Sequence, residues 1–152
     1  MPEKKTVERA RRDRAQGKSA STQAGEFVRE EMDHIREGKH GARSTKQAIA
    51  IGLSKARRAG VKLSPPRRGA TSERTRRQAA RDERKGRSGT RRSSPKRARA
   101  TRSALKREGR SAASRSSLSR QAKSAARRRS PSQRSAAAKK AARTRKRESR
   151  RS

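Results

Sequence analysis

The sequence predicts a mainly disordered chain with a small all-α module, a helical hairpin, near its N-terminus. The 152 residues carry 49 Lys and Arg against 13 Asp and Glu, which gives a formal net charge of +36. Only 25% of the residues are hydrophobic, and Phe27 is the single aromatic residue. Such a chain buries too little apolar surface to offset the entropy lost on folding. Order is therefore expected only where large aliphatic residues gather, in residues 1–63.

Charge and apolar content divide the chain into parts. Residues 1–63 hold 16 Lys and Arg and 8 acidic residues, whereas residues 64–152 hold 33 and 5. The consecutive prolines Pro65 and Pro66 lie at the boundary, and they favour an extended linker over a helix. We expect three regions: a basic N-terminal arm with a charged helix at 1–20, the hairpin module at 21–63, and a low-complexity basic tail at 64–152.

The first two helices are predicted from their end signals and spacing. A charged helix over residues 3–16 ends at Gly17 and has almost no apolar face. A second helix begins after the N-cap candidates Ser21 and Thr22 and ends at Gly38. Its apolar residues fall on one face by the i, i+4, i+7 spacing, with an aromatic ring beside them. These residues are Val28, Met32, Ile35 and Phe27.

The third helix has the clearest end signals. In "STKQ", Ser44 is placed as the N-cap and Gln47 as the third helical residue, which is a capping-box pattern. Gly60 provides a left-handed C-terminal residue, with Val61 positioned for the apolar contact that accompanies it. The loop "GKHGAR" joins this helix to the preceding one, so we expect a hairpin. Its apolar interface is small, and dimerisation through Ile51 is one way to support it.

The tail is predicted to form helix only transiently. "SAASR", "SAARR" and "SAAAKKAAR" make an irregular repeat of good helix formers. Segments 72–85, 117–129 and 133–148 are therefore expected to become helical when their charge is neutralised. None of them has a continuous apolar stripe, so none is expected to pack into a globular core.

The charge predicts nucleic-acid binding. A chain with dozens of cationic side chains binds polyanions by releasing condensed counterions, and arginine matches phosphate bidentately. The near-absence of aromatic residues disfavours platforms on which single-stranded bases stack, and a flexible tail gives little base readout. The candidate phosphate-binding residues are Lys39, Arg43, Lys46, Lys55, Arg57, Arg58, Lys62, Lys96, Arg97, Arg99, Arg127, Arg128, Arg129, Lys139, Lys140 and Arg143.

The helix over residues 45–59 is an alternative reader of DNA. Basic residues surround it, and the helix start at residues 44–46 would hold one phosphate through free amides. Against this hypothesis, a helix-turn-helix has a shorter, tighter turn than "GKHGAR". We expect a hairpin with a basic exterior rather than a recognition helix.

No catalytic, cofactor or metal site is predicted. His34 and His40 are the only histidines, there is no cysteine, and no third nitrogen or sulfur ligand lies nearby. The acidic residues of the second helix, such as Glu30 and Glu31, are expected to balance or dock basic segments rather than to catalyse a reaction. No apolar stretch has the length of a transmembrane helix, and the N-terminus lacks the apolar core of a secretory signal.

Two parts of the chain carry resemblances. "STQAGEFVREEMDHIREGKHGARSTKQAIAIGLSKARRAGVKL", residues 21–63, resembles a bacterial family of small, highly basic proteins of unknown function that are often labelled DNA-binding proteins. "SALKREGRSAAS", "LSRQAKSAARRR" and "SAAAKKAARTRKR" resemble its longer members. "SSPKRARATR", residues 93–102, resembles the Ser-Pro-Lys-Lys elements of linker-histone tails, and the tail is linker-histone-like in composition. The family resemblance implies a bacterial source and supplies no site residues.

The leading functional hypothesis is a histone-like, nucleoid-associated protein that neutralises duplex DNA with little sequence preference. We expect the protein in the cytoplasm at the nucleoid and not at a membrane. It is expected to be a homodimer if Ile51 forms a contact between two copies of the chain. A basic RNA- or ribosome-associated protein is one alternative. An adaptor whose helical N-terminal part binds a protein partner is the other. Salt dependence, competition by RNA and nuclease-resistant partner capture distinguish the three.

Overall fold

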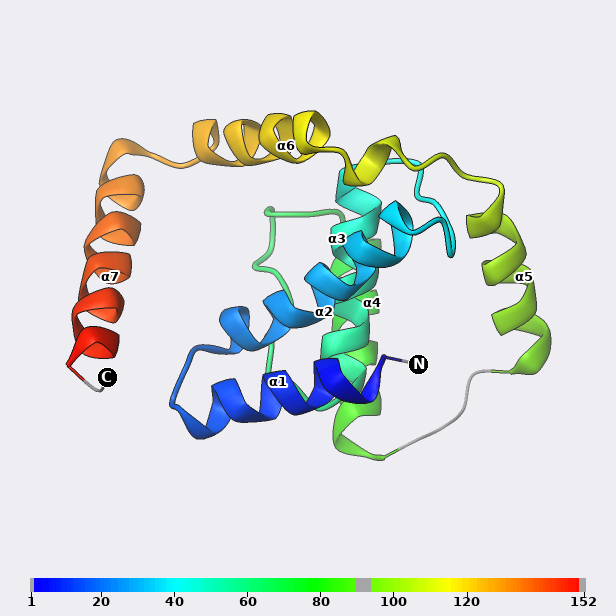
Figure 1. Cartoon of the computed structure of the whole chain (residues 1–152), viewed down its shortest axis with the longest axis horizontal. Coiled ribbons are helices and arrows are strands. Elements are labelled where there is room, and N and C mark those ends of the chain that lie inside the picture. The colour runs from blue at the N-terminus through cyan, green and yellow to red at the C-terminus, as the bar shows by residue number, and fades with distance from the viewer. Residues whose placement is uncertain (1, 90–93, 151–152) are drawn as a thin grey trace. The chain divides into compact units, whose positions relative to one another are not determined.

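Helices run through both the N-terminal part and the basic tail. The computed structural model describes residues 2–89 and 94–150. Figure 1 shows its helices, which form two compact units, Met1–Ser114 and Arg115–Ser152. Within the described residues the elements are α1 (Lys4–Ala15), α2 (Ala20–Arg36), α3 (Thr45–Arg58), α4 (Glu73–Arg87), α5 (Pro95–Lys106), the 3-10 turn η1 (Ser111–Ala113), α6 (Arg115–Arg127) and α7 (Pro131–Ser149).

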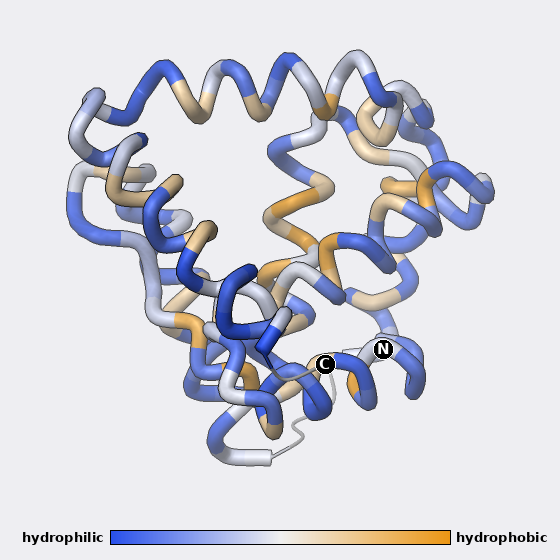
Figure 2. Tube along the Cα trace, turned by 60° about the vertical axis from the view of Figure 1, so that its left-hand side comes forward, coloured by the Kyte–Doolittle hydropathy of each residue, from blue (hydrophilic) through white to orange (hydrophobic). Residues whose placement is uncertain are grey.

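The predicted fold class is wrong. The chain is a folded helical protein, and its helices are not confined to a small N-terminal module. The first unit continues to Ser114, far beyond the expected hairpin. The prediction counted large apolar residues, whereas the tail contributes alanine and glycine, which let helices approach closely with little buried volume. Figure 2 shows how few positions along the chain are strongly hydrophobic.

The individual helix boundaries in the N-terminal part were predicted well. α1 ends before Gly17, which has a φ of 69°, and α3 ends before Gly60, with a φ of 90°. The Val61 amide donates to the Ala56 carbonyl, the longer bond of the predicted C-terminal motif. Ser44 caps α3 by accepting from the Gln47 amide, but Gln47 Oε1 accepts from the Arg43 amide instead of the Ser44 amide, so only half of the predicted capping box is formed. The second helix begins earlier than expected, because Ser19 is its N-cap.

The core of the first unit lies between α1, α2 and α3. Phe27 is 1% exposed and Ile35 is 0% exposed, so the predicted apolar face of α2 is the face that is buried. α2 and α3 pack together, as the hairpin prediction required, with α1 against α2. The main buried cluster consists of Ala10, Ala24, Phe27, Ala56 and Val61.

α4 packs against α3 and extends the predicted hairpin. Ala79 and Asp82 are buried at 5% and 2% exposure. Ser54 on α3 donates to Asp82 Oδ2 over 2.8 Å. A Cβ at Gly86 would collide with the Arg57 carbonyl oxygen, so glycine is needed at this crossing. Residues 79, 82 and 86 share one helical face, which explains why a helix without large apolar residues still docks.

Residues 105–113 of the tail bond directly to the loop and to the helices beside it. The Gly41 amide donates to the Leu105 carbonyl over 2.9 Å, and the Ala42 amide donates to Gly109 over 3.1 Å. Thr45 Oγ1 donates to the Ala112 carbonyl over 2.7 Å. These bonds satisfy backbone groups of the loop that joins α2 to α3.

The Ser-Pro element begins a helix. Ser94 is the N-cap of α5 and Pro95 occupies its first turn, a position that suits proline because the missing N–H has no helical partner. Ser93, the first residue of the element that resembles linker-histone tails, lies outside the described residues. Ser130 and Pro131 begin α7 in the same way, and there Ser130 and Gln133 complete a capping box.

The second unit, Arg115–Ser152, contains α6 and α7. Neither helix has a buried residue in the part of the unit that the structure describes. Helix propensity, together with the Ser130 cap of α7, therefore accounts for these two helices better than burial of apolar surface does. The predicted helical segments 117–129 and 133–148 overlap α6 and α7, each within two residues at either end.

Candidate nucleic-acid interface

All the predicted phosphate-binding residues except Lys55 and Arg57 are exposed. They fall on four surfaces: the loop and outer side of α3, the first half of α5, the end of α6, and the middle of α7. The exposed residues are Lys39, Arg43, Lys46, Arg58, Lys62, Lys96, Arg97, Arg99, Arg127, Arg128, Arg129, Lys139, Lys140 and Arg143.

Lys55 is held inside the first unit by two acidic residues of α2. Its Nζ lies 2.6 Å from Glu31 Oε2 and 3.5 Å from Glu30 Oε1. The carboxylates are buried, at 0% and 3% residue exposure, and the Lys55 side chain is 21% exposed. These ion pairs join α3 to α2. Because they already neutralise the Lys55 ammonium group, Lys55 is poorly placed to bind phosphate.

Arg57 has a structural role at the end of α3. Only 7% of the residue is exposed, and its guanidinium donates to the Leu63 carbonyl over 3.0 Å and to Ser64 over 3.4 Å. Burial lowers the pKa of Arg57, and the nearby charges of Asp82 and Glu83 oppose that shift. The side chain closes the turn that follows α3.

Two loop residues of the predicted set have partners within the protein. Lys39 Nζ lies 2.9 Å from Glu37 Oε2 and 3.4 Å from Glu3 Oε1, and the hydrogen bond to Glu37 raises the pKa of Lys39. For Arg43 the partner binds the backbone: its amide donates to Gln47 Oε1 over 2.7 Å. The Arg43 side chain is exposed. These side chains stay accessible, unlike those of Lys55 and Arg57.

The helix start proposed to hold one phosphate is partly satisfied by the chain itself. The Gln47 amide donates to Ser44 Oγ over 3.2 Å. One of the amides at the N-terminus of α3 is therefore already paired, which weakens this feature as an anion site.

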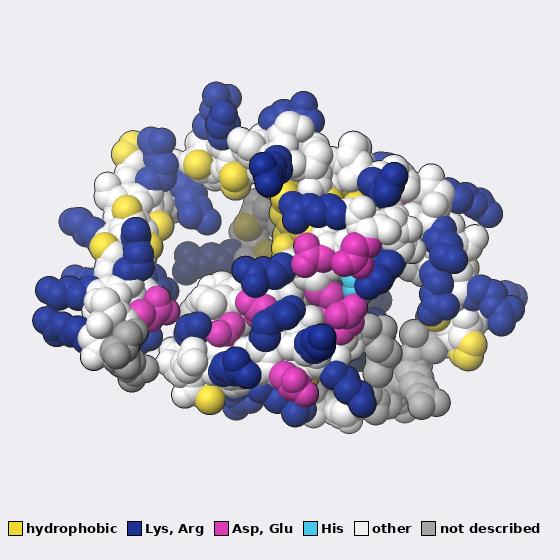
Figure 3. All heavy atoms as spheres, in the orientation of Figure 1, with side chains coloured by type: hydrophobic (Ala, Val, Ile, Leu, Met, Phe, Trp, Pro, Cys, Tyr) yellow, Lys and Arg dark blue, Asp and Glu magenta, His cyan; other side chains and the backbone are white. Residues whose placement is uncertain are grey.

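The acidic residues dock helices against one another, as the sequence analysis expected. Arg9 Nε lies 2.6 Å from Glu26 Oε2, an ion pair that joins α1 to α2. The Glu3 amide donates to Glu30 Oε2 over 3.1 Å. Figure 3 shows acidic side chains gathered around a histidine, with Lys and Arg side chains about them. Acidic side chains of the first unit thus pair with groups inside that unit, whereas many Lys and Arg side chains remain exposed.

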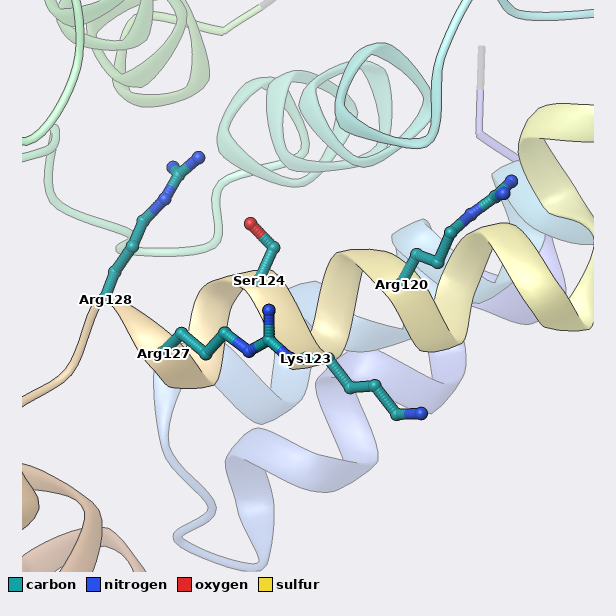
Figure 4. Close-up of a pocket in the computed structure, with 5 residues that line it drawn as sticks. All are labelled: Arg120, Lys123, Ser124, Arg127 and Arg128. Carbon is teal, nitrogen blue, oxygen red and sulfur yellow. The ribbon is translucent and has the colours of Figure 1, made fainter.

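A shallow hollow on α6 is lined by cations that the sequence analysis partly missed. Its lining residues are Arg120, Lys123, Ser124, Arg127 and Arg128. Figure 4 shows Arg120, Ser124 and Arg128 projecting from the same side of the helix. In the sequence these three residues are spaced four apart, and this spacing predicts that their side chains lie on one helical face. No acidic residue lies among these five.

Residues 3–68 match a family of unknown function, DUF6496. The matched segment contains α1, α2 and α3 and ends before α4. It includes the whole of residues 21–63, so the resemblance to a family of unknown function is confirmed, while the match carries no DNA-binding description. No curated protein and no solved structure matches the chain. Among the described helices, none is long and apolar enough to cross a membrane.

Proposed function

We propose that the protein binds nucleic acid by neutralising backbone phosphates, with duplex DNA as the ligand and little sequence preference. In this proposal it acts as a histone-like, nucleoid-associated protein. The second unit and α5 supply most of the binding charge, and the N-terminal helices with α4 form a folded base. Counterion release from the DNA provides the main driving force.

The observation that carries the proposal is the exposure of charge on α6 and α7. Every Lys and Arg among residues 115–150 is exposed, and Glu148 is the single acidic residue of that range. Helices without an apolar face gain nothing from packing on a protein core, whereas a line of cations suits a phosphate backbone. The cationic hollow lies on α6 and adds Arg120 and Lys123 to the exposed cations of that helix.

Weak sequence preference follows from the residue types on this surface. Long, exposed lysine and arginine side chains with no packed neighbours are not held in one orientation. Base readout needs side chains fixed against base edges in a groove. Contacts to phosphate and sugar position a protein on a duplex without specifying sequence.

Duplex DNA is favoured over single strands because the chain has a single aromatic residue, Phe27, and it is 1% exposed. No aromatic side chain is therefore available on the described surface to stack on an unpaired base. Structured RNA has the same phosphate chemistry and is the alternative that the measurement must include.

Three cations of α7 give the first experimental test. In the full-length protein, Lys139, Lys140 and Arg143 are changed together to glutamine, and binding to a labelled duplex is followed by fluorescence anisotropy across a salt series. Each lost phosphate contact should reduce the magnitude of the slope of log K against log salt by about 1. We expect weaker binding and a slope reduced by about 2 to 3.

The same helix offers a matched control. Ala136, Ala137 and Ala138 are exposed and adjacent, so their change to glutamine adds the same side chains to α7 without removing charge. This control should bind like the parent protein, and far-UV circular dichroism should show equal helix content in both variants. If the charge-removed protein and the control bind with the same affinity and slope, α7 is not a phosphate-binding surface.

A further inference from the structure

Both histidines of the chain meet at one buried carboxylate. One ring nitrogen of His34, one of His40 and one carboxylate oxygen of Glu31 all lie within 4.8 Å of one another. Glu31 and His34 lie three residues apart on α2, and so on the same side of the helix. Gly38, with a φ of 76°, turns the chain after the helix, and His40 follows it. The cluster is formed by the fold and is not continuous in sequence.

The bonding of His40 directs a lone pair at Glu31. His40 Nδ1 lies 3.0 Å from the Gly41 carbonyl oxygen, which can only accept, so Nδ1 carries the proton. The other nitrogen, Nε2, lies 3.2 Å from Glu31 Oε1. In a neutral imidazole this nitrogen is an acceptor that faces a negative oxygen. A cation between or on these atoms, either a proton or a metal ion, is required to make the contact favourable.

His34 is held in a comparable way. Its Nε2 lies 2.9 Å from Glu3 Oε1, and a carboxylate accepts the proton of that nitrogen. The neutral ring then has its lone pair on Nδ1. A carboxylate bonded to the second nitrogen of a histidine is the usual support of a metal-binding imidazole, because it fixes the tautomer and raises the basicity of the ligand.

Glu31 is a buried acceptor that is not fully satisfied. The residue is 0% exposed, and neither carboxylate oxygen accepts a well-directed hydrogen bond from the described residues, although Lys55 Nζ lies 2.6 Å from Oε2. We interpret the Lys55 contact as an ion pair that occupies Oε2. It leaves Oε1 directed at His40, and ligating carboxylates commonly have such a partner on their second oxygen.

We propose that Glu31, His34 and His40 bind a divalent transition-metal ion, with Zn²⁺ as the best fit. Two imidazoles and one carboxylate are a ligand set that zinc uses in proteins, with water in the fourth position. Ligands at 2.0–2.1 Å in a tetrahedron lie about 3.3 Å apart, close to the observed separation of Glu31 Oε1 from His40 Nε2. Magnesium and calcium prefer all-oxygen sites and fit less well.

The bound ion would fasten the loop after α2 to the helix. This loop also donates hydrogen bonds to the Leu105 and Gly109 carbonyls through Gly41 and Ala42, so the ion would stabilise the part of the first unit where the loop meets that segment. The competing account is that both imidazoles are protonated and form ion pairs with Glu3 and Glu31. The two accounts differ in metal affinity and in pH dependence, because metal binding requires neutral histidines.

The test uses the full-length, metal-free protein at pH 7.5. Co²⁺ is added as a spectroscopic probe, and Zn²⁺ is then used to displace it. We expect one equivalent to give the visible absorption of tetrahedral Co²⁺, displacement by Zn²⁺, and a rise in melting temperature with excess Zn²⁺. Binding should weaken as the pH is lowered, because a metal ion binds the neutral imidazole and competes with protons for it.

Variants separate the site from general cation binding. His34→Asn and His40→Asn should each weaken Co²⁺ binding at least about 100-fold, and Glu3→Gln should weaken it about 10- to 100-fold. Glu37→Gln is the matched control, because this exposed carboxylate lies near the cluster but outside it, and it should bind like the parent. Circular dichroism identifies any variant that fails to fold.

Two results would overturn the proposal. The first is the absence of a tetrahedral Co²⁺ spectrum and of any Zn²⁺-dependent change in melting temperature in the folded parent protein. The second is metal affinity in a folded His34→Asn, His40→Asn double variant equal to that of the parent. Either result would assign the cluster to histidine–carboxylate ion pairs alone. Neither result bears on DNA binding, which is measured separately.

Discussion

Gly52 of α3 lies directly against the backbone of Val28 on α2. A Cβ at position 52 would be 2.7 Å from the Val28 Cα and 3.0 Å from its Cγ2. These distances are too short for non-bonded carbon atoms, so the two helices meet at a separation that only glycine allows. The contact explains how a chain with few large apolar residues still packs α2 on α3 closely.

Gly52→Ala is predicted to destabilise the protein. The added methyl group must displace the α2 backbone, at a cost of about 1–3 kcal/mol. The matched control is Gly25→Ala, because Gly25 is an exposed glycine within α2 whose added Cβ would contact nothing. This change should stabilise the helix by about 0.5–1 kcal/mol. Urea denaturation measures both, and equal effects of the two substitutions would contradict the close crossing.

Asp82→Ala is predicted to loosen α4. The buried carboxylate accepts from Ser54 over 2.8 Å and from Gln78 over 3.2 Å, and loss of such bonds costs about 1–3 kcal/mol. Hydrogen exchange should show faster amide exchange in α4, with little change in α1. Arg77→Ala, an exposed change on the same helix, should leave exchange almost unaltered. An α4 that exchanges freely in the parent protein would show that it does not dock.

Thr45→Val tests the attachment of the tail to the loop. The substitution keeps the shape but removes the bond from Thr45 Oγ1 to the Ala112 carbonyl, which should cost about 1 kcal/mol. Thr101→Val, at an exposed position of α5, provides the comparison and should change stability by less than about 0.5 kcal/mol. Thermal unfolding distinguishes them. Identical melting temperatures would mean that the bond to Ala112 contributes nothing.

Glu73 is predicted to titrate below its usual range. Hydrogen bonds from Arg76, at 3.0 Å to Oε1, lower the pKa of Glu73. Because the folded-state pKa is depressed, this pair stabilises α4 above the unfolded-state pKa, and the contribution is lost as pH falls through the folded-state value. Side-chain NMR should give a midpoint below 4.5 in the parent and a higher midpoint in Arg76→Ala. The same midpoint in both proteins would contradict the pair.

The helix ends could be predicted from sequence because they depend on local chemistry. Ser44 as an N-cap and Gly60 as a left-handed residue act within one turn of the chain, and the structure has both. The buried face of α2 followed from a spacing of large apolar residues in the same way. Signals of this kind need no knowledge of which segments meet.

The packing of the tail could not be predicted by the same reasoning. Gly86 against Arg57, and Gly41 against Glu108, are contacts between segments far apart in sequence. They depend on the absence of a side chain, and a glycine that permits a close approach looks in sequence like one in a flexible linker. Composition therefore predicted disorder where the chain docks small residues.

The candidate sites also divide into features that the sequence predicts and features that depend on how the helices pack. Exposed charge on α6 and α7 followed from composition, whereas the sequestration of Lys55 by Glu31 depends on the placement of α3 against α2. The cluster of Glu31, His34 and His40 was missed because only nitrogen and sulfur ligands were considered for the two histidines. A carboxylate three residues before His34 was the signal that could have found it.

The central claim is binding to phosphate backbone without sequence preference, and a salt series on the full-length protein tests it most directly. Anisotropy is measured with two duplexes of unrelated sequence and with a structured RNA between about 50 and 200 mM salt. We predict equal affinities for the two duplexes and a fall of about 10³- to 10⁵-fold over that range, as for six to ten phosphate contacts. Tighter binding to the RNA would change the ligand from DNA to RNA. Affinity for one duplex that persists at high salt and is absent for the other would contradict the account.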